Sequence, residues 1–146
     1  MNERYPIGET ATLAVSLLRH EREQAGYPQW SAAIALRGAE ATISVPGHYT
    51  QVLAARLRGA ETRFAAGIGV GARLGRDEYL DLTGIVRGRA ESLALSSTSR
   101  SPLRVSLELP RAEIEPLALL LTEAHELIET LRQGLALVPD SLPDPI

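Results

Sequence analysis

The sequence predicts an α+β fold that is mostly β, with seven or eight antiparallel strands in one meander. Three observations predict it: apolar and polar residues alternate in short stretches, glycine-containing turns separate these stretches, and a helical apolar period appears only near the C-terminus. A sheet of so many strands usually curls or partly closes, because open edges leave backbone groups unpaired. We therefore expect a curled sheet or partly closed barrel, covered by one C-terminal amphipathic helix.

Length and composition limit the possibilities further. The chain has 146 residues, of which 23% are charged, and its formal net charge is -3. This length predicts one β-rich domain over residues 1–134. The chain has no cysteine, which excludes disulfides and thiolate metal sites. Its start does not resemble a signal peptide, and the longest apolar run, Leu117–Leu121, is too short to cross a bilayer. We expect a cytoplasmic protein that does not enter a membrane.

The N-terminal region has two possible interpretations. Residues 10–17 alternate as a strand does, whereas the charged run that follows, 19–26, resembles a helix end closed by Gly26. We favour a strand over 10–17 with the charged run as a loop or short helical turn. Whether residues 10–25 are strand or helix stays open.

A recurring phrase predicts three hairpins. Leu-Arg-Gly-Ala-Glu occurs at 36–40 and again at 57–61, and a looser version occurs at 86–91. Glycine at the first central position is typical of a type II′ turn, which requires a positive φ there. In the first hairpin this places Ile34 opposite Ile43 and Ala32 opposite Val45, so that all apolar residues share one face.

The other two hairpins follow the same reasoning. The second, turning at Gly59, places Leu53, Leu57 and Phe64 on the inner face and sets Arg56 opposite Arg63 on the outer face. The third is ambiguous, because Arg89 lengthens its loop.

Other turns and strands complete the expected meander. Residues 45–48 (Val-Pro-Gly-His) match a type II turn, and residues 103–109 alternate cleanly as a half-buried strand. The glycines of the run 67–71 occupy every second place in a strand pattern. A bent strand explains them better than a phosphate-binding loop, which needs a different spacing.

The C-terminal helix is predicted over about 113–133. Its apolar residues recur at three- and four-residue steps: Ile114, Leu117, Ala118, Leu121, Ala124, Ile128 and Leu131. Pro116 fits the first turn and Gly134 fits the end. The Pro-rich segment 135–146 is expected to be an extended or disordered tail.

The apolar arc of this helix is wider than one sheet contact requires. Two alternatives stay open: the domain's own sheet or tail covers the extra leucines, or another protein does. The candidate oligomer interface comprises Leu117, Leu120, Ala124, Leu127 and Leu131.

No pattern of residues indicates catalysis. The histidines at 20, 48 and 125 lack the spacing of a metal site, and the carboxylates of Asp77, Glu78 and Asp81 fit a solvated turn. We expect neither an enzyme nor a bound cofactor or metal.

Charge is distributed unevenly along the chain. Residues 50–106 carry nine arginines against five acids, whereas the segment from 107 onward carries eight acids against two arginines. An arginine-bearing sheet face could bind an anion. The candidate binding residues are Arg56, Arg58, Arg63, Arg73, Tyr79, Arg87 and Arg104.

These observations favour a non-catalytic protein-binding or oligomerising module, such as a small regulator or an accessory subunit of a larger assembly. The alternative is a single-stranded nucleic-acid-binding protein that uses the arginine-bearing face and stacks bases on tyrosine. The net negative charge and the low aromatic content of 4% argue against this alternative. A carrier of a small apolar ligand inside the curled sheet ranks last.

Overall fold

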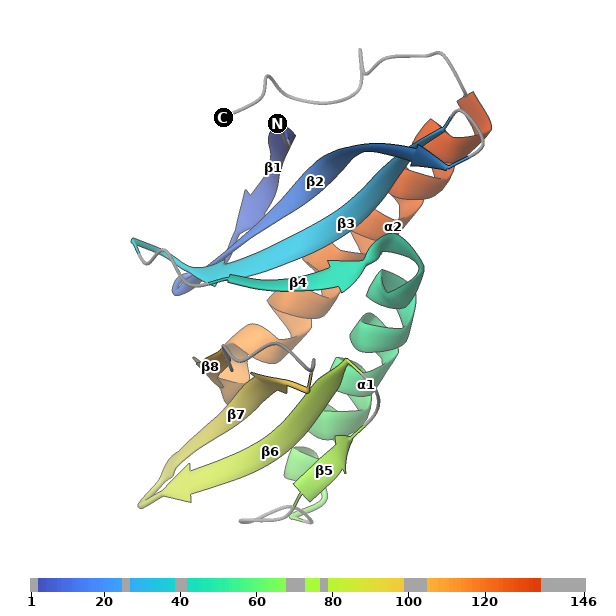
Figure 1. The fold of residues 1–146 in the computed structure, drawn as a ribbon. Coiled ribbons are helices and arrows are strands. Elements are labelled where there is room, and N and C mark those ends of the chain that lie inside the picture. Colours follow the sequence, from blue (N-terminus) through green and yellow to red (C-terminus); the bar gives the residue numbers. More distant parts are fainter. Residues whose placement is uncertain are drawn as a thin grey trace.

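Two four-stranded antiparallel sheets and two α-helices make up the described part of the chain (Figure 1). The structure is a computed structural model that describes residues 3–24, 27–38, 42–67, 73–76, 79–98 and 105–134. The predicted α+β class with antiparallel strands is confirmed. The predicted single meander and single helix are wrong, because the chain leaves the first sheet after its fourth strand and forms a helix before the second sheet begins.

The first sheet has the strand order β1-β2-β3-β4, built from β1 (Glu3–Glu9), β2 (Leu13–Gln24), β3 (Tyr27–Leu36) and β4 (Thr42–Pro46). The predicted register of the first hairpin is confirmed, since Ile34 pairs with Ile43 and Ala32 with Val45. Gly38 has the expected positive φ, at 79°.

The charged run at the N-terminal region belongs to a strand rather than to a loop or helical turn. β2 continues through it to Gln24, and β3 supplies its partners, with Arg19 opposite Trp30 and Gln24 opposite Tyr27. Pairing with a neighbouring strand outweighs the local helical preference of charged residues. Ala25 and Gly26 lie outside the described residues.

The predicted second hairpin is wrong, because residues 50–65 form a helix. β4 ends at Pro46, a 3₁₀ turn η1 covers Gly47–Tyr49, and α1 follows over Thr50–Ala65. The type II turn expected at 45–48 is therefore the entry to a helix. The positive φ predicted for Gly59 is wrong, because Gly59 lies within α1. The sequence Leu-Arg-Gly-Ala-Glu therefore forms a helix around Gly59, whereas Gly38, in the other copy, lies in a turn.

The second sheet has the order β5-β6-β7-β8, from β5 (Arg73–Arg76), β6 (Leu80–Arg87), β7 (Ala90–Ser97) and β8 (Ser106–Pro110). The ambiguous third hairpin is a two-residue turn: Arg87 pairs with Ala90, and Gly88 has a φ of 64°. The prediction that a strand passes through Gly67 is wrong at that residue. Gly67 lies just after α1 and has a φ of 71°, which is not a strand conformation. The rest of that glycine run, residues 68–71, lies outside the described residues.

A second 3₁₀ turn and helix close the described chain. η2 covers Arg111–Glu113 and α2 covers Ile114–Gly134, which confirms the predicted C-terminal helix. The expected tail, 135–146, lies outside the described residues.

The two halves repeat one order of elements, four strands, a 3₁₀ turn and an α-helix. In both halves a proline ends the fourth strand, Pro46 in one and Pro110 in the other, and these prolines are 64 positions apart. The buried residues of the helices match at the same offset: Thr50, Leu53, Ala54, Leu57, Ala60 and Phe64 in α1, and Ile114, Leu117, Ala118, Leu121, Ala124 and Ile128 in α2. Each helix thus buries the same positions against a sheet.

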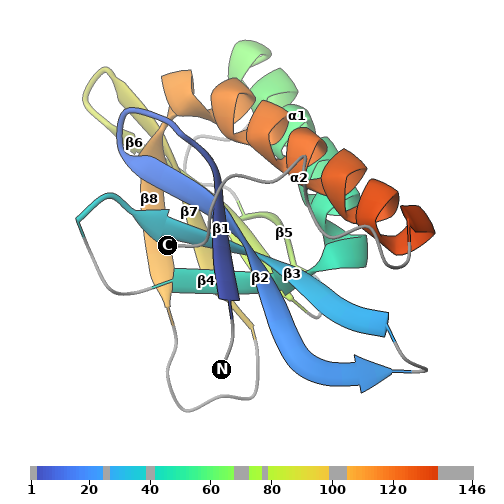
Figure 2. The same cartoon turned by 90° about the horizontal axis from the view of Figure 1, so that it is seen from above.

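The two helices lie together on one side of the sheets (Figures 1 and 2). They run antiparallel, because Glu61 near the end of α1 contacts Arg111 just before α2, while Gly47 before α1 lies against Ile128 of α2. Buried side chains from both sheets and both helices meet in one core. No helix in the described ranges is long and apolar enough to cross a membrane.

Candidate functional site

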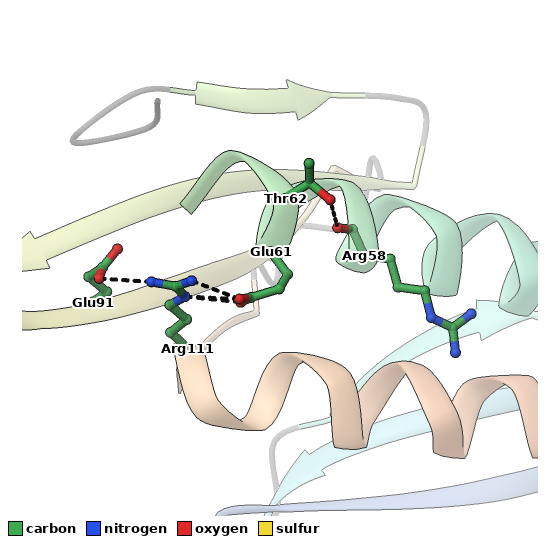
Figure 3. A network of polar contacts seen from close by, with 5 residues as sticks. All are labelled: Arg58, Glu61, Thr62, Glu91 and Arg111. Atoms are coloured by element: carbon green, nitrogen blue, oxygen red, sulfur yellow. Dashed lines mark hydrogen bonds and ion pairs between the residues drawn. The ribbon is translucent and has the colours of Figure 1, made fainter. Parts of the chain in front are cut away.

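Arg111 forms an extensive polar network with two glutamates (Figure 3). Its guanidinium donates to Glu61 through Nε and Nη2, with the Nη2 bond at 2.8 Å, and to Glu91 through Nη1 at 3.1 Å. These three residues come from η2, α1 and β7. The hydrogen bonding of Arg111 to Glu61, with a smaller contribution from its bond to Glu91, raises the pKa of Arg111 above its ordinary value. The network therefore holds a permanent cation between two carboxylates and ties three elements together.

An open cleft of about 780 Å³ lies beside this network. Its lining includes all three members of the network together with Arg89 and Glu115. Glu115 is already engaged, since it lies 3.3 Å from Arg58 of α1. Each of the three carboxylates that line the cleft, those of Glu61, Glu91 and Glu115, therefore lies within ion-pair distance of an arginine.

Glu113 is a buried carboxylate whose two oxygens accept hydrogen bonds from the turn between β1 and β2. Oε1 accepts from the Thr10 hydroxyl and from the Thr12 backbone N–H, and Oε2 accepts from the Thr12 hydroxyl at 2.8 Å. Burial by itself would raise the pKa of Glu113, but the three hydrogen bonds outweigh it and the pKa lies below its ordinary value. This carboxylate joins the start of α2 to the first sheet.

A matching cluster lies at the start of α1. The rings of Tyr49 and Tyr79 have centroids 4.7 Å apart, and the Tyr79 hydroxyl lies 3.4 Å from Nε2 of His48. Arg56 donates to the Tyr49 hydroxyl at 2.7 Å and to the backbone oxygen of Leu80 at 3.2 Å. The cluster joins α1 to the start of β6.

The candidate binding residues do not gather on one sheet face. Arg56, Arg58 and Arg63 lie on α1, so Arg56 and Arg63 do not face each other across a hairpin. Arg73 lies on β5, and Arg87, at the end of β6, is 2.8 Å from Glu108 of β8. Of the predicted set, the structure brings Arg56 and Tyr79 to one cluster through Tyr49. Arg104 lies outside the described residues.

The candidate interface residues on α2 pack mainly inside the molecule. Leu117 and Ala124 are fully buried in the protein's own core. Among the half-buried members, Leu120 packs against the main core, and Leu127 and Leu131 pack against a second buried cluster made of Tyr5, Leu17, Ala124 and Ile128. Leu120 reaches β1, where a Cβ added to Gly8 would lie 2.6 Å from its Cδ2. The wide apolar arc of α2 is explained largely by contacts with α1 and the first sheet.

Exposed apolar side chains are found instead at other positions of the two helices. Among the described residues, the exposed large hydrophobic side chains are Val52 of α1, at 47% exposure, and Leu119 of α2, at 52%. The neighbouring Ala55 and Pro116 are also exposed. We call these four residues the outer helix face. The sequence analysis misses the α1 residues of this face, because it predicts a hairpin there. The helical period of the apolar residues over 53–64 is the signal that places Val52 outward.

The described residues contain no group of three or more His, Asp and Glu side chains able to hold a metal ion. Comparison with protein-family models, curated proteins and solved structures finds no match.

Proposed function

We propose that the protein is a non-catalytic protein-binding module that docks its partner on the outer helix face. The observation that carries this proposal is the placement of Val52 and Leu119, about half exposed, on two helices that pack side by side. Exposed large apolar side chains favour protein association, because covering them removes apolar surface from water.

The polar clusters support the non-catalytic part of the proposal. Arg111, Glu113 and Arg56 each connect elements that are distant in sequence, and their hydrogen bonds go to other side chains and backbone groups of the same chain. Such contacts position secondary structure, and a structural role accounts for each of them. A small regulator or an accessory subunit of a larger assembly fits a module of this kind.

Site-specific photo-crosslinking tests the proposal in cells that express the chain. A photoreactive amino acid is placed at Leu119, and the matched control places it at Ser44, an exposed position on β4. We expect a discrete protein adduct from position 119 and none from position 44. Equal or absent crosslinking at the two positions would contradict the proposal.

A further inference from the structure

We infer that the chain is a single-chain form of a two-fold dimer of ββββα units, in which the helix of each unit packs on the sheet of the other. We call residues 3–67 the first unit and residues 73–134 the second unit. The pairing surface of each unit is the inner face of its sheet together with its helix, and the partner that fits this surface is the other unit. The inference goes beyond the proposed function and does not depend on the outer helix face.

The two sheets correspond row by row across their strands. In the first sheet, Val15 pairs with Ile34 and Ile34 with Ile43, and all three are buried. The same row of the second sheet consists of buried leucines: Leu82, Leu95 and Leu107. Two outward rows correspond in the same way, Leu18–Ser31–Pro46 with Ile85–Ser92–Pro110 and Ser16–Ala33–Ser44 with Thr83–Ala94–Glu108. The two sheets therefore share one register, which sets the inward face in each of them.

A register shift at the edge of each sheet recurs at the same place. The pairing of β1 with β2 shifts between Pro6 and Gly8, and the pairing of β5 with β6 shifts between Arg73 and Gly75. In both sheets the glycine after the shift pairs with the first member of the buried row. Shifts of this kind are specific features of a particular sheet and do not follow from the strand order alone. The two units therefore correspond in local detail as well as in the order of their elements.

Each helix contacts the sheet of the other unit, and Figure 1 shows α2 beside the first sheet and α1 beside the second. Leu120 of α2 reaches β1, where a Cβ added to Gly8 would lie 2.6 Å from its Cδ2. Arg56 of α1 donates to the backbone oxygen of Leu80 in β6 at 3.2 Å. Two subunits that exchange an identical element make contacts of this kind. A unit without its partner would lose the helix that packs on its sheet.

Contacts between the units occur in matched pairs. Arg111, just before α2, lies over the ring of Phe64 in α1, with its guanidinium carbon 5.8 Å from the ring centroid. The residues 64 positions away from these two are Gly47, just before α1, and Ile128 in α2. They are also in contact, because a Cβ added to Gly47 would lie 3.2 Å from Ile128. A two-fold axis requires this reciprocity, since every contact must recur when the two units are exchanged.

One matched pair distinguishes the two units. Arg111 also donates to Glu61 of the first unit at 2.8 Å. Its equivalent Gly47 has no side chain that could bind His125, the equivalent of Glu61. Two first units paired together would leave Glu61 without this arginine, and two second units would leave Arg111 without this glutamate. The pairing surface therefore selects the unlike unit, because the wrong pair loses the ion pair.

Cleavage between the units tests the inference on the full chain. A protease recognition sequence is inserted after Gly67, which is exposed, has a positive φ and has nothing within 4 Å of an added Cβ. Control chains carry the same insertion after Gly38 or Gly88, which share these three properties but lie inside the first and the second unit. Each chain is cleaved, unfolded in urea and refolded by dilution.

The position of the cut should decide whether the pieces refold. After the cut that follows Gly67, we expect both pieces to elute as one 1:1 complex with the circular dichroism spectrum of the uncut chain. The chains cut after Gly38 or Gly88 should lose most of this recovery, because the cut divides one sheet between two pieces. Separate pieces after the Gly67 cut, or equal recovery in all three chains, would overturn the inference.

A cysteine pair reports which units have paired. The chain has no cysteine, so Gly8→Cys and Leu120→Cys introduce its only two thiols. A Cβ at position 8 lies 3.8 Å from Cγ of Leu120, which the sulfur of Leu120→Cys replaces, and this distance suits a disulfide. In the chain cleaved after Gly67, mild oxidation should join the two different pieces. Disulfides between like pieces, or no disulfide at all, would overturn the exchange of helices between unlike units.

Discussion

Tyr49 and Glu113 occupy equivalent positions just before α1 and α2, and each contacts residues that lie next to a strand of the other half. Glu113, in the second half, accepts hydrogen bonds from Thr10 and Thr12 in the turn that joins β1 to β2. Tyr49, in the first half, packs its ring on Tyr79, which immediately precedes β6 of the second sheet. The two halves are thus joined reciprocally, once by a carboxylate and once by an aromatic pair.

The Glu113 contact predicts an acid-dependent loss of stability. Replacing Glu113 with Gln should lower the free energy of unfolding at pH 7 by about 1–3 kcal/mol, because a buried charge-assisted hydrogen-bond set is weakened. The folded-state pKa lies below its ordinary value, so this contribution is fully present above the unfolded-state pKa of about 4.3. It is lost as the pH falls through the lower folded-state pKa.

Urea unfolding at several pH values between neutral and acid checks this prediction. The difference between the wild type and Glu113→Gln should shrink as the solution becomes more acidic. Glu126→Gln, which changes an exposed carboxylate on α2, is the control and should shift the unfolding free energy by less than about 0.5 kcal/mol. A difference that stays constant down to strongly acidic pH would show that the ionised form of Glu113 is not what stabilises the fold.

Gly59→Ala should stabilise the fold. Gly59 lies within α1, is exposed, and a Cβ added there meets nothing within 4 Å. Alanine in a helix interior is favoured over glycine by about 0.5–1 kcal/mol, so the melting temperature should rise. Thermal melts monitored by circular dichroism measure it, and a fall in melting temperature would argue against a helix at this position.

Gly38→Ala, in the same sequence phrase, should have the opposite effect. Gly38 has a φ of 79°, a conformation that alanine adopts with strain. We expect a loss of about 1 kcal/mol in the free energy of unfolding. If Gly59→Ala raises the stability of the fold and Gly38→Ala lowers it, the same five-residue sequence forms a helix in one place and a turn in the other.

Gly47→Ala should destabilise the entry to α1 by a different mechanism. A Cβ on Gly47 would lie 2.9 Å from the backbone oxygen of Trp30 and 3.2 Å from side-chain carbons of Ile128. Because a backbone atom cannot give way as a side-chain end does, we expect a loss of about 1–3 kcal/mol. Chemical denaturation measures it, and unchanged stability would contradict the close approach of β3 to η1.

Binding to single-stranded nucleic acid should be weak and independent of the candidate arginines. Arg58 and Arg87 lie on different elements and are each paired with a glutamate, and the chain has a net charge of -3. Fluorescence anisotropy with a labelled oligonucleotide at two salt concentrations measures the affinity. Tight, salt-sensitive binding that falls in an Arg58→Ser, Arg87→Ser double variant would favour the nucleic-acid hypothesis instead.

Local sequence determined the elements whose pattern has a single interpretation. The first hairpin is one, because Gly38 suits the turn and the apolar residues of both arms fall on one face only in the observed register. The C-terminal helix is another, because its leucines, isoleucines and alanines repeat at three- and four-residue steps over five turns.

Tertiary structure decided the elements whose local pattern is ambiguous. Leu53, Leu57 and Phe64 fit both an alternating and a helical period, and only burial against α2 and the core selects the helix. The charged run at the end of β2 is a strand because β3 pairs with it. The outer helix face likewise exists only once α1 and α2 pack side by side, because exposure is a property of neighbours in space and not of sequence order.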